Sequence, residues 1–156
     1  MATVNINKST NEYIEIGIIH QLKRLGGMKG CAIISKGAEQ EAPDNLPCVV
    51  VNCESVSKYG DFPDEIRAKQ ALVSCTLYGD SEQTTQAKFE NYACQLEARL
   101  FDIPGMKSRF NAPTSGRDTR KVKAIHLHDV TDVQTEADTR GTVWSFTAGA
   151  TLICHA

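Results

Sequence analysis

The 156-residue sequence lacks the features that mark several large classes of protein. Its longest apolar runs, such as Cys48–Val51, fall far short of the roughly 20 residues that a membrane-spanning helix needs. The start, MATVNINKST, has no basic region followed by an apolar core, so we expect no signal peptide. With 17 basic and 19 acidic residues, the formal net charge of -2 provides no global attraction to nucleic acid or anionic lipid. We expect a soluble protein made in the cytoplasm, with no membrane partner.

Catalytic and cofactor motifs are also missing. The cysteines form no C-x-x-C pair, which argues against a zinc ribbon or a thioredoxin-type site and favours reduced, buried thiols. They are Cys31, Cys48, Cys53, Cys75, Cys94 and Cys154. Neither a G-x-S-x-G nucleophile elbow nor a G-x-x-x-x-G-K-[ST] phosphate-binding loop occurs. The sequence therefore predicts no enzyme and no cofactor.

Apolar periodicity predicts two helices. The first covers residues 10–25, with Ser9 and Glu12 as a capping box. Its apolar face consists of Ile14, Ile18, Leu22 and Leu25. The second follows a turn at Gly79-Asp80, where Asp80 and Gln83 form a second capping box, and ends before Pro104. Its stripe is Phe89, Tyr92 or Ala93, Leu96 and Leu100.

Strand patterns fill most of the remaining sequence. Residues rich in Val, Ile and Thr, or alternating between apolar and polar, predict strands at 31–35, 46–54, 69–78, 122–130 and 142–154. Residues 55–65 and the acidic stretch 131–141 are expected to be loops. The whole chain, 1–156, is then one α+β domain. We expect one mainly antiparallel twisted sheet, with the N-terminal helix and the long central helix packed on it.

The stretch KAIHLHDV, residues 123–130, raises the question of a metal site. On a strand, His126 and His128 point to the same side and can reach one metal, with His155 or a carboxylate as a third ligand. The simpler interpretation places both histidines on the wetter face of the sheet, opposite Ile125 and Leu127. A small metal-binding protein or enzyme is therefore kept as an alternative.

A long segment, about residues 104–123, shows no periodicity and is strongly basic. Its one acidic residue is Asp118, and its basic residues are Lys107, Arg109, Arg117, Arg120, Lys121 and Lys123. Such a loop can contact a partner surface or nucleic acid backbone, or it can be solvated and serve solubility. A nucleic-acid-binding module is a further alternative. The long strand 142–154 needs either a neighbouring strand or a partner subunit to cover its edges.

The order of these elements resembles the tail terminator, or tail completion, proteins of long-tailed bacteriophages. The resemblance rests on LPCVVVNCES, on ALVSCTLYGDSEQTTQAKFENYACQLEARLF, on VKAIHLHDV and on GTVWSFTAGATLICHA. Within these, Leu96-x-x-x-Leu100 and the R-G-x-x-W of Arg140 to Trp144 carry most of the likeness.

The resemblance implies a structural virion protein that assembles with itself into a ring, usually a hexamer. The ring caps the tail tube, stops its polymerisation and forms the surface that joins tail to head. Its partners would be the tail tube protein and the neck or head-connector proteins, with non-specific contact to DNA in the lumen through the basic segment. A neck or head-completion protein of the same particle is the nearest alternative.

Overall fold

The structure, a computed structural model, describes residues 9–23, 28–36, 47–58, 69–102, 104–105, 121–128, 130–138 and 141–155. The elements follow the order α1 (Thr10–Lys23), β1 (Ala32–Ser35), β2 (Cys48–Lys58), β3 (Lys69–Asp80), α2 (Gln86–Phe101), β4 (Lys121–His128), β5 (Gln134–Asp138) and β6 (Gly141–His155). Both predicted helices are confirmed.

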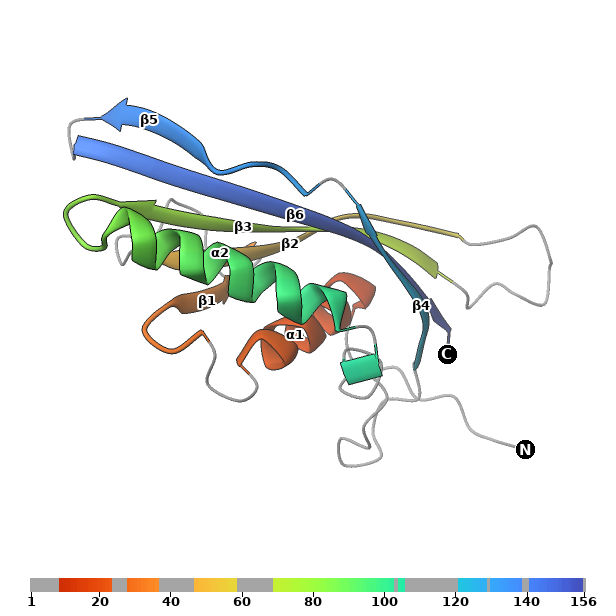
Figure 1. The fold of residues 1–156 in the computed structure, drawn as a ribbon. Coiled ribbons are helices and arrows are strands. Elements are labelled where there is room, and N and C mark those ends of the chain that lie inside the picture. The colour runs from red at the N-terminus through yellow and green to blue at the C-terminus, as the bar shows by residue number, and fades with distance from the viewer. Residues whose placement is uncertain are drawn as a thin grey trace, which may run out of the picture.

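The sheet is built around its last strand. Its order is β1-β2-β3-β6-β4, and β5 also pairs with β6. All pairings are antiparallel except that of β1 with β2. Both helices lie on the same side of this sheet (Figure 1). The α+β prediction, with a mainly antiparallel sheet and two helices packed on it, is confirmed.

The core lies between the helices and one face of the sheet. Alternation along the strands places one set of apolar side chains inward, and these are Ala71, Val73, Cys75 and Leu77 from β3 with Trp144, Phe146, Ala148, Ala150, Leu152 and Cys154 from β6. The predicted stripe of α2 packs on them, and the rings of Phe89 and Trp144 have centroids 5.6 Å apart. The predicted apolar stripe of α2 is therefore buried in the core.

The two predicted loops are partly wrong. β2 continues through Ser55–Lys58, with a register shift between Cys53 and Ser55, and residues 59–65 lie outside the described part. Within 131–141, residues Gln134–Asp138 form β5 against the start of β6. The side chains at 134–137 are all exposed, so this edge strand shows no apolar alternation that would have revealed it.

The predicted start of the second helix is also wrong. β3 runs on to Asp80, which is fully buried and closes a turn: its carboxylate accepts a hydrogen bond from the Gln83 N–H at 2.9 Å. The helix begins at Gln86 instead, with Thr85 as its N-cap accepting from the Lys88 N–H at 3.2 Å. Asp80 and Gln83 do interact as the capping pattern predicts, but their interaction closes the turn that precedes the helix.

The terminal strand is paired on both sides. β3 pairs with β6 from Val143 to Cys154 on one side, while β5 and β4 divide the other side between them. Thr131 adds a link between these two, because its N–H donates to the Thr147 carbonyl at 2.9 Å. Internal pairing therefore satisfies β6, and no partner subunit is needed to cover its edges.

A buried carboxylate fixes α1 to the sheet. Glu15 accepts hydrogen bonds from the Cys53 N–H at 3.0 Å and from the Ser35 hydroxyl. Asn11, one turn earlier, donates to the Cys53 carbonyl at 3.3 Å. Cys53 borders the register shift in β2, where the ladder with β3 is interrupted. The helix thus supplies hydrogen bonds at the point where the regular ladder is broken.

We predict that Glu15→Ala lowers the free energy of unfolding by about 1–3 kcal/mol, because it leaves the buried Cys53 N–H without its acceptor. Urea denaturation followed by circular dichroism measures this loss. Glu82→Ala, which removes an exposed glutamate outside this contact, is the matched control and should change stability by less than about 0.5 kcal/mol. Equal effects of the two substitutions would contradict the role assigned to Glu15.

Candidate functional site

Between Glu54 of β2 and Asp80 of β3, which lie at its ends, the face of the sheet opposite the helices carries a continuous group of uncharged side chains from β2, β3 and β6. We call it the open face, and it consists of Val50, Asn52, Leu72, Ser74, Thr76, Tyr78, Val143, Ser145, Thr147, Gly149, Thr151 and Ile153. No described element covers this face (Figure 1). Sheet faces in water usually carry charged residues, and depletion of charge is typical of the centre of protein interfaces. The open face therefore has the composition of a contact surface.

The two histidines lie at the border of the open face. His126 is exposed opposite Thr151, and His128 is half-buried opposite Gly149. Their ring centroids are 6.3 Å apart, and the His128 Nε2 is hydrogen bonded to the Thr151 hydroxyl at 2.8 Å. The prediction that both histidines share a strand face is confirmed. On this face His126 is exposed to solvent and His128 is half-buried.

The register separates the suggested third ligand from this pair. His155 pairs with Lys121, four residues along β6 from Thr151, which is a distance of about 13 Å between backbones. Among the described residues, no group of three His, Cys, Asp or Glu side chains is placed to hold a metal ion. The geometry thus brings together only two of the three predicted ligands, which does not support a site of three protein ligands.

Most of the basic segment falls outside the described residues. This applies to Lys107, Arg109, Arg117 and Arg120. Lys121 and Lys123 belong to β4, in which Lys121 pairs with His155 and Lys123 lies at the register shift between Val122 and Ala124. The partner or DNA contact proposed for these six residues stays a prediction.

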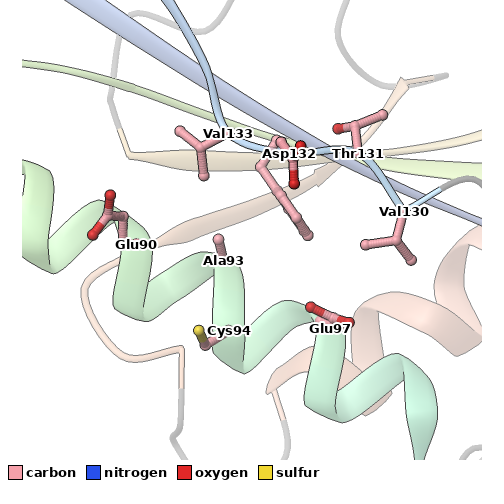
Figure 2. Close-up of a pocket in the computed structure, with 9 residues that line it drawn as sticks. Glu90, Ala93, Cys94, Glu97, Val130, Thr131, Asp132 and Val133 are labelled. Carbon is pink, nitrogen blue, oxygen red and sulfur yellow. The ribbon is translucent and has the colours of Figure 1, made fainter.

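A groove that the sequence did not predict lies between α2 and the segment that joins β4 to β5. Its volume is about 450 Å³, and its lining comprises Glu90, Ala93, Cys94 and Glu97 of α2, Val130–Val133, and Phe146 of β6. Figure 2 shows these side chains around the gap between the helix and the segment. Nothing in the local sequence marks it, since it depends on how closely the edge segment approaches the helix.

The floor and the rim of this groove differ in character. Ala93 and Phe146 are buried and form an apolar floor, to which Val130 adds a side chain that is 38% exposed. Three carboxylates, from Glu90, Glu97 and Asp132, stand around it. An apolar floor with an acidic rim fits a cationic chain segment that also carries apolar side chains.

One of the six thiols, that of Cys94, differs from the others because it is exposed. Burial raises the pKa of Cys75 to about 12, and burial with the neighbouring Cys48 raises the pKa of Cys31 to about 12. Burial, with Glu15 nearby, raises the pKa of Cys53 to about 11. All six cysteines are free thiols, and four are buried as predicted. Cys94, in the groove, is exposed, so the expectation of buried thiols is wrong for this residue.

No protein-family model matches this chain, and a search of curated proteins finds no relative. Within the described residues, no helix is long and apolar enough to cross a membrane.

In dilute, unassembled protein at pH 8, we predict that a single thiol reacts rapidly with Ellman's reagent. That thiol is Cys94, because a group with a pKa near 12, such as Cys31, is ionised in only about one molecule in ten thousand at this pH. Cys94→Ser should abolish the fast phase, whereas Cys31→Ser should leave it unchanged. Several thiols reacting at one rate would contradict this assignment.

Proposed function

We propose that this chain is a structural subunit that assembles into a ring on the tail tube of a long-tailed bacteriophage. The ring stops polymerisation of the tube and forms the surface to which the head is joined. Its partners are further copies of the chain, the tail tube protein and the neck or head-connector proteins. Such a role is performed by binding surfaces and needs no reacting group.

The observation that carries the proposal is the uncharged open face. A sheet face without charge over three strands costs less free energy to dehydrate than a charged face when another protein covers it, because no ionised group has to leave water. Left permanently exposed, it would be a broad surface lacking the charges that keep neighbouring molecules apart. The composition of the open face is thus consistent with a subunit whose working state is an assembly.

The arrangement of the elements gives further support. The N-terminal helix, the strand-helix unit β3–α2 and the long terminal strand follow the order on which the resemblance to tail terminators rests. Rings are built from head-to-tail contacts, which require two different surfaces on each subunit. The open face and the groove lie on opposite sides of the sheet, so each subunit offers two different surfaces to its partners.

Light scattering coupled to size exclusion, followed by negative-stain microscopy, tests the proposal. We expect rings of about six subunits, and we expect added protein to halt the growth of tubes formed by the cognate tail tube protein. A strict monomer at high concentration would overturn the proposal. A ring that binds connector proteins but leaves tube growth unaffected would instead identify a neck or head-completion protein.

The open face can be tested separately with Thr76→Lys. Thr76 lies between Val50 and Thr147 in the middle of this face, so the lysine would place a charge where a partner excludes water. We predict that assembly or tube capping weakens by at least about tenfold, a change of about 1.4 kcal/mol. Ala87→Lys on the exposed side of α2 adds the same charge and should have no effect. Equal assembly and tube capping by the two variants would show that the open face is not a contact surface.

A further inference from the structure

The charges of this chain are divided unevenly between one segment and the remainder. Residues 104–123 contain six basic residues and one acidic residue, a net charge of +5. Since the whole chain carries -2, the other residues together carry -7. Each molecule therefore combines an acidic body with one strongly basic segment, and two molecules attract each other when the segment of one meets the body of the other.

The groove is the place on the described body where acidic side chains surround an apolar floor. Glu90 and Glu97 are seven residues apart on α2, or about 10.5 Å along the helix axis. In an extended chain, residues three apart are separated by about 9–10 Å. Arg117 and Arg120 have this spacing in the sequence, so both guanidinium groups can reach a carboxylate of the rim at once.

Apolar side chains of the basic segment fit the remainder of the groove. The segment includes Met106 and Phe110, and the floor offers Ala93, Phe146 and the exposed Val130 as apolar contacts. Burial of one aromatic ring contributes far more area than a surface ion pair, while the ion pairs fix the direction of the bound chain. The groove thus matches the segment in both polarity and charge.

We propose that the groove of one copy binds the part of the basic segment that precedes β4, residues 106–120, of the next copy in the ring. This inference rests on the proposed function, because it names the contact that joins neighbouring subunits. The contact is head-to-tail: the groove and the segment are different parts of the molecule, so every copy offers one of each and a ring can close. The basic segment then acts as a link between subunits rather than as a contact to DNA.

Charge reversal on each side tests this contact. The groove variant is E90K/E97K and the segment variant is R117E/R120E, and each alone makes groove and segment repel. We expect either variant alone to assemble at least about tenfold more weakly than the wild type in sedimentation at 100 mM salt. The control E12K/E82K reverses two exposed acids outside the groove and should assemble normally.

Mixing the two variants decides between neighbours and self-contact. In a one-to-one mixture, the lysine groove of E90K/E97K meets the glutamate segment of R117E/R120E, and the unchanged groove of R117E/R120E meets the unchanged segment of E90K/E97K. Both interfaces attract, so alternating rings should form. If the segment instead occupies the groove of its own chain, mixing restores nothing, which overturns the proposal. Cys94 gives a second readout, because its labelling should slow on assembly and stay fast in E90K/E97K.

The outcomes separate this inference from the proposed function. If the wild type forms no ring, both the proposed function and this contact fail. If rings form and cap tubes but both charge-reversal variants assemble like the control, the groove contact is wrong while the proposed function stands. If R117E/R120E assembles normally but no longer binds DNA, the segment contacts nucleic acid instead, and the proposal is likewise overturned.

Discussion

Pairing of β6 along both of its edges is the constraint on which the rest of the structure depends. Through this strand, β3 on one side and β4 with β5 on the other are held in fixed register. A slip of one residue would turn Trp144 and Phe146 outward and bring Ser145 and Thr147 into the core. The register of β6 therefore determines the apolar face on which both helices pack and, on its reverse, the uncharged open face.

The same strand explains why a groove exists beside α2. His128 and Gln134 are six positions apart on the outer edge, whereas their partners Gly149 and Ser145 are only four positions apart on β6. The edge must therefore accommodate two extra residues, and such bulges bend the chain and interrupt pairing. The bulged stretch is the one that faces α2 across the groove, with Val130 left exposed. An edge interrupted in this way also accepts an added strand poorly, which leaves faces and grooves for contacts between subunits.

Regular periodicity explains what the sequence could predict. The stripes of α1 and α2 and the alternation in β3 and β6 were recognised because each repeats over ten or more residues and matches a buried face. β5 was not predicted, because its side chains from Gln134 to Ala137 are all exposed and show no such pattern. The groove escaped because it arises from register shifts and from the approach of α2, where Phe89 lies so close to Gly79 that a Cβ there would come within 2.6 Å of its ring. The spacing of His126 and His128 in the sequence predicted that they share a strand face. Their separation from His155 depends on the register between β4 and β6, which the local sequence does not determine.

The open face and the groove would contribute differently to an assembly. An uncharged sheet face can bury a large area, yet it gives little preference for one orientation of a partner over another. Ion pairs around an apolar floor do the opposite, since they add little area but penalise every arrangement that brings like charges together. A ring subunit needs both properties, because its neighbours must be held at one fixed angle for the ring to close. On this argument, the open face supplies binding area and the acidic groove supplies the register between copies.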